Sequence, residues 1–154
     1  MVRIILVRHG ETKWNIEGRY QGQEDTELSE RGLEQGRLLA QGLKDVPIDV
    51  FVSSPLKRSF MTASFCAELH GNTVAKDERL TEINHGLWEG RLAGDIEAEY
   101  PDEFAAWHTQ PHTVQMPREG GESLEDVRVR VRAAFDDYAQ KYAGKTVLVA
   151  AHDA

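Results

Sequence analysis

The sequence predicts an α/β protein, a three-layer α/β/α sandwich with a mainly parallel sheet. Residues 2–7 and 146–151 are runs of apolar, largely β-branched residues without alternation, the pattern of strands buried on both faces. Helical segments with capping signals lie between such runs. Strands that alternate with helices indicate a doubly wound sheet, and such sheets bind ligands at the carboxyl ends of their strands.

Composition supports one soluble domain over residues 1–154. The chain is 40% hydrophobic, and 18 Lys and Arg against 26 Asp and Glu give a net charge of −8, which disfavours nucleic acid or an anionic membrane as a partner. The single Cys66 cannot form an internal disulfide. The apolar start is too short for a signal peptide or membrane span. We therefore expect a cytoplasmic protein.

The first half of the chain predicts two strands and two helices. Ser29 is expected to cap one helix, and Ser53-Ser54-Pro55 to cap the next, with proline at its first position. The expected elements are a strand over 2–7, a helix over about 30–43, a strand over 48–52 and a helix over about 55–70.

The second half is expected to be less regular until its last helix. Ser123 opens a capping-box-like sequence, and Gly144 ends the helix that follows. The expected elements are a short strand over 73–75, a structured loop over 80–90, short helices over 94–100 and 102–108, a long loop over 109–121, a helix to about Tyr142 and a strand over 146–151.

Two histidines, His9 and His152, follow predicted strands, so we expect them to be neighbours in space. Arg8-His9-Gly10 combines a cation, an imidazole able to act as a nucleophile and a residue that permits close backbone approach, which suits a phosphoryl group. Arg58 lies in the first turn of a predicted helix, where the helix dipole disfavours a cation. A solvated surface cation is the simpler interpretation of this residue.

The order of motifs closely resembles the histidine phosphatase superfamily, also called phosphoglycerate mutase-like, over nearly the whole chain. The motifs are Leu6 to Thr12, Asn15, Gly18 to Gly22, Leu28 to Gly32, Ser53 to Ser59, Leu80 to Glu82, Gly86 to Gly90, Gly120 to Ser123 and His152. The resemblance implies that a helix and at least one more strand follow His152. We therefore expect residues 1–154 to be an incomplete part of a longer domain, lacking this C-terminal helix and strand.

The resemblance also implies a role for each site residue. His9 would be the nucleophile that becomes phosphohistidine, and Glu82 would be the proton donor. The phosphoryl oxygens would be surrounded by the side chains of Arg8, Arg58 and His152, with Asn15 and Gln21 completing the pocket. Paired guanidiniums can stabilise a transferring phosphoryl group, so we expect neither a metal nor another cofactor.

We therefore expect hydrolysis of a small phosphomonoester through phosphohistidine, as in the compact bacterial phosphatase branch of the family. Only 70 positions separate Glu82 from His152, which leaves no room for the insertion of the cofactor-dependent phosphoglycerate mutases that this family includes. Such a mutase is one alternative, and a catalytically silent domain that binds a phospho-ligand is another. Asp153 stands where many relatives have Gly, and an extra anion there is expected to weaken phosphate affinity. The particular metabolite and the oligomeric state stay open.

Other motifs have simpler interpretations. The alternating Arg128, Arg130 and Arg132 are expected to spread around a solvated helix surface. His108 and His112 lack the glutamate and the uninterrupted helix of a zinc-protease motif. The three tryptophans, Trp14, Trp88 and Trp107, are expected to form pocket walls. The 85–120 region is expected to contact the leaving group.

Overall fold

A four-stranded parallel sheet lies at the centre of the protein, here described by a computed structural model over residues 1–117 and 120–153. The strand order is β1-β4-β2-β3, and each neighbouring pair is parallel. The strands are β1 (Arg3–Arg8), β2 (Val50–Ser53), β3 (Val74–Lys76) and β4 (Thr146–Ala151). The predicted α/β class and parallel sheet are confirmed.

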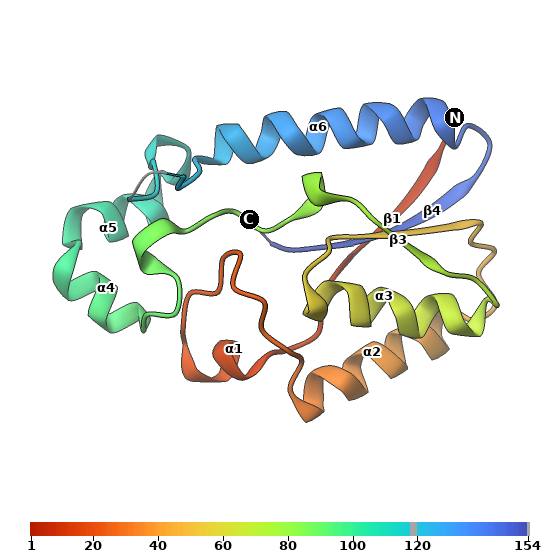
Figure 1. Cartoon of the computed structure of the whole chain (residues 1–154), viewed down its shortest axis with the longest axis horizontal. Helices are drawn as coiled ribbons and strands as arrows, with labels where there is room; N and C mark the ends of the chain where they lie inside the picture. The colour runs from red at the N-terminus through yellow and green to blue at the C-terminus, as the bar shows by residue number, and fades with distance from the viewer. Residues whose placement is uncertain (118–119, 154) are drawn as a thin grey trace.

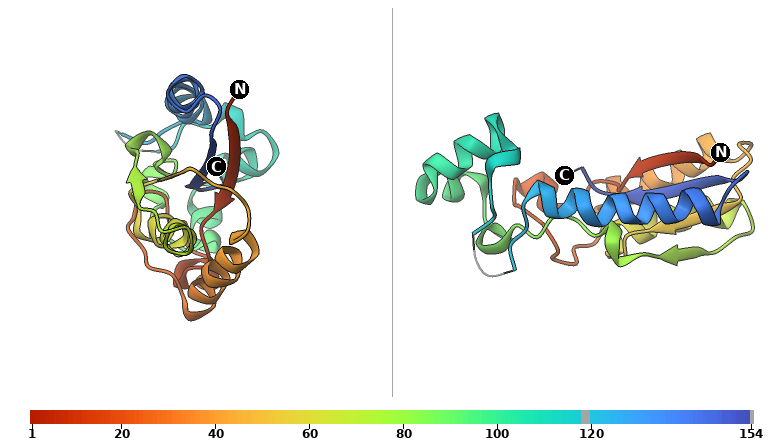
Figure 2. Two further views of the ribbon diagram at one scale, coloured as in Figure 1. Left: turned by 90° about the vertical axis from the view of Figure 1, so that its right-hand side faces the viewer. Right: turned by 90° about the horizontal axis from the view of Figure 1, so that it is seen from above.

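Helices cover both faces of the sheet, as Figures 1 and 2 show, which gives the three expected layers. Helices α2 (Glu30–Leu43) and α3 (Lys57–Leu69) lie on one face, and α6 (Leu124–Lys141) runs along the other. Ser29 caps α2 by accepting the Gly32 amide, and Ser123 opens α6 with a capping box. Both of these capping predictions are confirmed.

The position of β4 inside the sheet explains why its sequence is continuously apolar. Val147 and Val149 pack in a cluster with Ala134 and Tyr138 of α6. Leu148 and Ala150 pack on the opposite face in a cluster with residues of α2 and α3. All four of these β4 side chains are fully buried. Because successive side chains of a strand point to opposite faces, burial on both faces removes the alternation.

A third hydrophobic cluster lies beyond the carboxyl ends of the strands. Helices α4 (Ala93–Glu99) and α5 (Pro101–Thr109) form this part of the molecule, away from the sheet in Figure 1, together with the short 3-10 helices η2 (Gly86–Trp88) and η3 (Pro111–Thr113). A further 3-10 helix, η1 (Glu78–Leu80), packs instead against α6. Trp88 is fully buried in this cluster, packed with residues that include Ile83 and Ile96. Trp88 is therefore a core residue, and its assignment as a pocket wall was wrong.

The start of α3 also differs from expectation. The helix begins at Lys57, its N-cap residue Leu56 makes no side-chain cap, and Pro55 precedes the helix. Ser54 instead uses its hydroxyl within the site described below. A further short helix, α1 (Lys13–Glu17), was not expected; Thr12 and Asn15 form its capping box.

Two positions of the predicted loop 109–121, residues 118 and 119, lie outside the described residues. The rest of that loop contains η3 and a bridge between Gln115 and Ser123. No helix in the described part of the chain is long and apolar enough to cross a bilayer.

Candidate active site

The strand register brings His9 and His152 together. Arg8, the last residue of β1, pairs with Ala151, the last residue of β4, so the two histidines leave adjacent strands at the same level. The His9 amide donates to the Ala151 carbonyl at 3.2 Å, and the two imidazole ring centres are 5.3 Å apart. The expected proximity of two residues far apart in sequence is confirmed.

His9 is held as a neutral imidazole with a defined tautomer. Its Nδ1 lies 2.7 Å from the Gly10 carbonyl, so Nδ1 carries the proton that is donated and Nε2 keeps a free lone pair. Burial above all, together with the positive charges of Arg58 and Arg8, lowers the pKa of His9 to about 4, against the opposing effect of the Gly10 hydrogen bond. A neutral Nε2 is the form of histidine that can attack phosphorus.

Arg58 is fully buried, which excludes its interpretation as a solvated surface cation. Its Nη1 donates to the Glu24 carbonyl at 2.8 Å and its Nη2 to the Gly22 carbonyl at 2.7 Å. These bonds join the start of α3 to the 22–26 loop. Its Nε is buried and has no hydrogen-bond partner among the described residues, so it is available to an anion.

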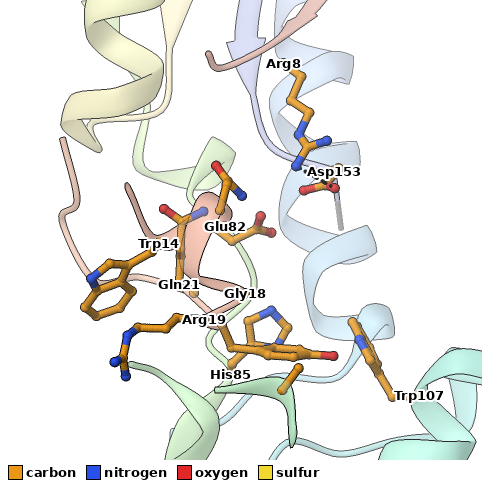
Figure 3. A pocket seen from close by; sticks show the side chains of 13 residues that line it. Arg8, Trp14, Gly18, Arg19, Gln21, Glu82, His85, Trp107 and Asp153 are labelled. Carbon is orange, nitrogen blue, oxygen red and sulfur yellow. Dashed lines mark ion pairs between the residues drawn. The ribbon is translucent and has the colours of Figure 1, made fainter. Parts of the chain in front are cut away.

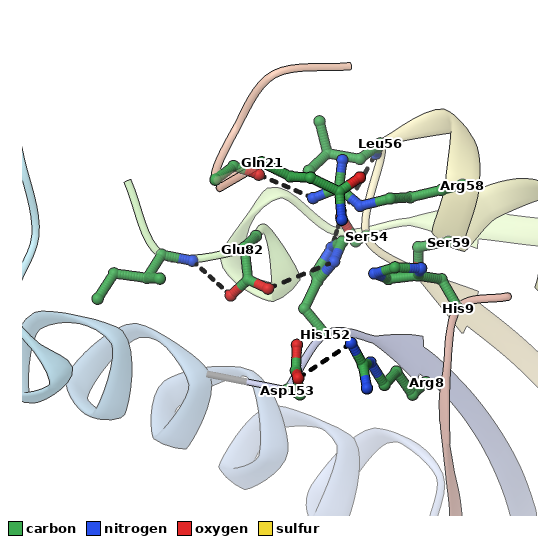
Figure 4. Close-up of polar contacts among 12 residues, drawn as sticks. Arg8, His9, Gln21, Ser54, Leu56, Arg58, Ser59, Glu82, His152 and Asp153 are labelled. Atoms are coloured by element: carbon green, nitrogen blue, oxygen red, sulfur yellow. Dashed lines mark hydrogen bonds and ion pairs between the residues drawn. The ribbon is translucent and has the colours of Figure 1, made fainter. Parts of the chain in front are cut away.

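His152 is oriented by Ser54, as Figure 4 shows. His152 Nε2 lies 2.9 Å from Ser54 Oγ, which also accepts the Leu56 amide, so the Ser54 hydroxyl proton is free to be donated to Nε2. His152 Nδ1 then carries the ring proton, and it is buried without a partner among the described residues. Burial and the nearby arginines lower the pKa of His152, which keeps the ring neutral.

Glu82 lies in the loop between η1 and η2 and is buried to 7% exposure. Burial raises the pKa of its carboxyl to about 7, although the Ile83 amide donates to Oε1 at 2.8 Å and opposes this shift. Glu82 Oε2 lies 3.9 Å from His152 Nδ1. A buried carboxyl whose pKa lies near 7 carries a proton in a substantial fraction of molecules at neutral pH, which suits it to donate a proton.

Arg8 and Asp153 border the site from the ends of β1 and β4. Arg8 Nη2 lies 3.0 Å from Asp153 Oδ2, and both side chains are more than half exposed. Figure 4 shows this pair on the other side of His152 from Arg58. The anion anticipated beside the pocket therefore neutralises part of the charge of Arg8.

Asn15 and Gln21 use their oxygens within the protein. Asn15 Oδ1 accepts the Thr12 amide at 2.9 Å, and Gln21 Oε1 accepts the hydroxyls of Thr12 and Thr26, each at 2.6 Å. These bonds fix the orientation of both amide groups. Both residues line the cavity described next, and their amide nitrogens bond to no other described residue.

A cavity of about 390 Å³ opens next to these residues, shown in Figure 3. Its lining includes the charged side chains of Glu82, Arg8 and Asp153 and several aromatic side chains. His85 contacts Tyr20 and Trp107 edge to face, with ring centres 5.0 and 5.5 Å apart. Of the 85–120 region, His85, Ala93 and Trp107 line this cavity, and their contact with a leaving group stays a prediction. Over residues 1–117 and 120–153, no three His, Cys, Asp or Glu residues are grouped as a metal site requires.

Sequence reasoning missed two contributors. Ser54 was assigned to a helix cap, but its hydroxyl holds His152. Arg130 was placed on a solvated surface, but its guanidinium donates to the Glu82 carbonyl. The sequence carries no local signal for this contact, because Glu122 precedes the N-cap residue Ser123 and meets Arg130 only through the fold.

Comparison with known proteins agrees with this arrangement. A family model described as the histidine phosphatase superfamily (branch 1) matches residues 4–154. Phosphoserine phosphatase 1 of Hydrogenobacter thermophilus is 45% identical over 152 residues, covering 99% of this chain and 71% of that protein. A probable phosphoglycerate mutase of Yersinia pestis is 36% identical over 156 residues, covering 99% and 70%.

Solved structures lead to the same family. A mycobacterial glucosyl-3-phosphoglycerate phosphatase in complex with VO3 matches with a TM-score of 0.90 at 34% identity, covering 97% of this chain and 75% of that one. The order of the motifs, the parallel sheet with paired histidines at its carboxyl edge, and these similarities have one explanation: the chain belongs to the histidine phosphatase superfamily.

Proposed function

We propose that the protein hydrolyses a small phosphomonoester through a phosphohistidine on His9, without a metal ion. The observation that carries this proposal is the state of His9. Its Nδ1 proton is committed to the Gly10 carbonyl, its pKa is lowered to about 4, and its free Nε2 therefore belongs to a neutral imidazole.

In the first half-reaction, His9 Nε2 attacks phosphorus in line with the ester oxygen. A P–N bond forms and the P–O bond to the leaving group breaks. Glu82 gives its proton to the departing alkoxide, so the alcohol leaves neutral and Glu82 becomes a carboxylate. The raised pKa of Glu82, about 7, keeps this proton in place before the reaction.

In the second half-reaction, water attacks the phosphohistidine. The Glu82 carboxylate takes one proton from the water as the O–P bond forms and the P–N bond breaks, which returns neutral His9 and protonated Glu82. Inorganic phosphate is released. One carboxyl thus acts as acid and then as base, and the enzyme ends in its starting protonation state.

Five side chains are assigned to stabilise the phosphoryl oxygens. Arg8 and the unpartnered Nε of Arg58 supply positive charge, and the Nδ1 proton of His152 supplies a neutral donor. The amide nitrogens of Asn15 and Gln21 extend the set of donors from the neighbouring loop. Preorganised donors of this kind stabilise the charge of a transferring phosphoryl group.

The substrate class follows from the cavity and the relatives. A volume of about 390 Å³ suits a small metabolite, and aromatic side chains in its lining offer contacts to the leaving group. Because the 45% identical relative is named a phosphoserine phosphatase, O-phospho-L-serine is the first substrate to test.

The direct test is to trap the intermediate. The protein is mixed with p-nitrophenyl phosphate in the presence of EDTA, and the reaction is quenched with alkali, in which phosphohistidine survives and phosphoserine does not. We expect phosphate on His9 and turnover that EDTA does not reduce. His9→Ala removes both, whereas His108→Ala, at an exposed position on α5, retains both. Phosphate binding without turnover would instead identify a silent binding domain.

Mutase activity is the second candidate, because one relative is named a probable phosphoglycerate mutase. Both activities pass through phosphohistidine, so the distinguishing step is the fate of that group. With 3-phosphoglycerate and a bisphosphoglycerate primer, a phosphatase releases inorganic phosphate and a mutase forms the 2-phospho isomer. We expect release of phosphate.

A further inference from the structure

Arg130 differs from the two arginines beside it on α6. The side chains of Arg128 and Arg132 are 65% and 70% exposed and pair with Glu125 and Asp136 of the same helix. The Arg130 side chain is only 19% exposed and is directed away from solvent, toward the segment that precedes η2. The solvated surface position expected for all three arginines is therefore found only for Arg128 and Arg132.

Every N–H group of the Arg130 guanidinium is used. Nε donates to Glu122 Oε1 at 2.8 Å and Nη2 to Glu122 Oε2 at 2.9 Å, a two-pronged ion pair. The three remaining N–H groups donate to backbone carbonyls. Nη1 donates to Arg79 at 2.8 Å and Thr81 at 2.6 Å, and Nη2 donates to Glu82 at 3.1 Å. A guanidinium has five donors, and none is left over.

Glu122 holds the same segment from its other end. Its Oε2 accepts the Asn84 amide at 2.8 Å, and its own amide donates to the Asn84 carbonyl at 3.0 Å. The ion pair of Arg130 and Glu122 thus binds the backbone before, at and after Glu82. Gln23 Nε2 also donates to the Glu82 carbonyl at 3.1 Å, and Glu89 accepts the His85 amide at 3.1 Å. Arg130 and Glu122 differ from these two residues in that they bind several positions of the segment at once.

We propose that Arg130, oriented by Glu122, is a positioning residue that holds the proton donor Glu82 against the leaving-group oxygen. This inference rests on the function proposed above, in which Glu82 is the acid. The guanidinium binds the Glu82 carbonyl and leaves the carboxyl group free. A direct ion pair with the carboxyl would favour its charged form and remove the proton that the reaction needs.

The effect of displacing Glu82 on the rate should depend on the leaving group of the substrate. An alkyl phosphate needs a proton on its departing oxygen, whereas p-nitrophenolate leaves without one. Displacement of Glu82 therefore slows the hydrolysis of the alkyl phosphate and not that of p-nitrophenyl phosphate. General acid catalysis contributes ~10²–10⁴-fold, and loss of alignment by about 1 Å removes much of it.

The test compares Arg130→Met and Arg130→Lys with the original protein on O-phospho-L-serine and p-nitrophenyl phosphate. We expect kcat on the alkyl phosphate to fall at least ~10-fold and kcat on the aryl phosphate to fall less than ~3-fold, in line with the size of acid catalysis. Lys keeps the charge but cannot make five bonds, so Arg130→Lys should behave as Arg130→Met does. Arg128→Met, on the same helix, is the matched control and should change neither rate.

A double variant separates this inference from the proposed function. If Arg130 acts through Glu82, Arg130→Lys combined with Glu82→Gln is no slower on the alkyl phosphate than Glu82→Gln alone. Equal losses on both substrates, or additive losses in the double variant, would overturn the positioning function. If Glu82→Gln itself shows no preference between leaving groups, the assignment of Glu82 as acid fails first. Should Arg130→Met not fold, Arg130→Lys and Glu122→Gln decide the matter on the same two substrates.

Discussion

Glu82 Oε2 lies 3.9 Å from His152 Nδ1, and both side chains are almost completely buried. This separation is too long for a hydrogen bond. The Glu82 proton is therefore not committed to His152, and an ester oxygen placed between the two groups could accept it. The carboxyl is thus not bonded to His152 in the resting protein, and burial raises its pKa to about 7.

The pH dependence should reflect His9 and Glu82. His9 must be neutral, which holds above its pKa of about 4, and Glu82 must be protonated, which holds below its pKa of about 7. Hydrolysis of an alkyl phosphate should therefore decline as pH rises through about 7. The decline is measured as the basic limb of kcat/KM on O-phospho-L-serine. Glu82→Gln should lower this activity by ~10²–10⁴-fold and abolish the limb. A limb that persists in Glu82→Gln would assign it to another group.

Replacement of Arg58 by Lys should cost both activity and stability. Lysine keeps the charge, but it cannot bind the Gly22 and Glu24 carbonyls while also directing a donor at phosphate. We expect kcat to fall by ~10²-fold or more, as when a preorganised donor is removed. Unfolding free energy should fall by about 1–3 kcal/mol because buried carbonyls lose donors. Urea denaturation and steady-state assays measure these effects. Lys57→Met, at the neighbouring exposed position, should change neither.

Two glycines of α2 should respond in opposite directions to alanine. A Cβ atom at Gly32 would lie 2.0 Å from the Glu11 carbonyl oxygen, in the loop that carries His9, so Gly32→Ala must displace that loop. A Cβ at Gly42 meets nothing within 4 Å. We expect Gly42→Ala to raise the unfolding free energy by about 0.5 kcal/mol through helix propensity and Gly32→Ala to lower it. Thermal denaturation of both variants checks this, and stabilisation by Gly32→Ala would contradict the close contact.

Removal of the Asp153 charge should strengthen phosphate binding. Asp153 competes for Arg8, but both groups are exposed, and an exposed ion pair contributes at most about 1 kcal/mol. We therefore expect Asp153→Asn to lower the inhibition constant of inorganic phosphate by ~2–5-fold. Asp136→Asn, which removes an exposed carboxylate paired with Arg132, is the control for net charge. Weaker inhibition in Asp153→Asn would show that Asp153 supports the phosphate site.

Much of the fold could be predicted because each element has a local signal. The apolar runs of β1 and β4 and the caps at Ser29 and Ser123 gave nearly correct boundaries. The prediction was wrong where a side chain contacts a residue far away in the sequence. Ser54 was read as a cap because serine before proline usually is one, but its hydroxyl faces His152, 98 positions away. Helix α1 was missed because five residues carry too weak a periodicity.

The sequence by itself determined the α/β class, the order of the motifs and the chemical types collected in the site, because residue identity and local periodicity encode these properties. Tertiary structure alone decided which tautomer His9 adopts, how far the pKa of Glu82 rises, and that Arg130 turns inward while Arg128 stays in solvent. Such properties depend on burial and on hydrogen bonds between residues distant in sequence. They arise only when the strands and helices are assembled.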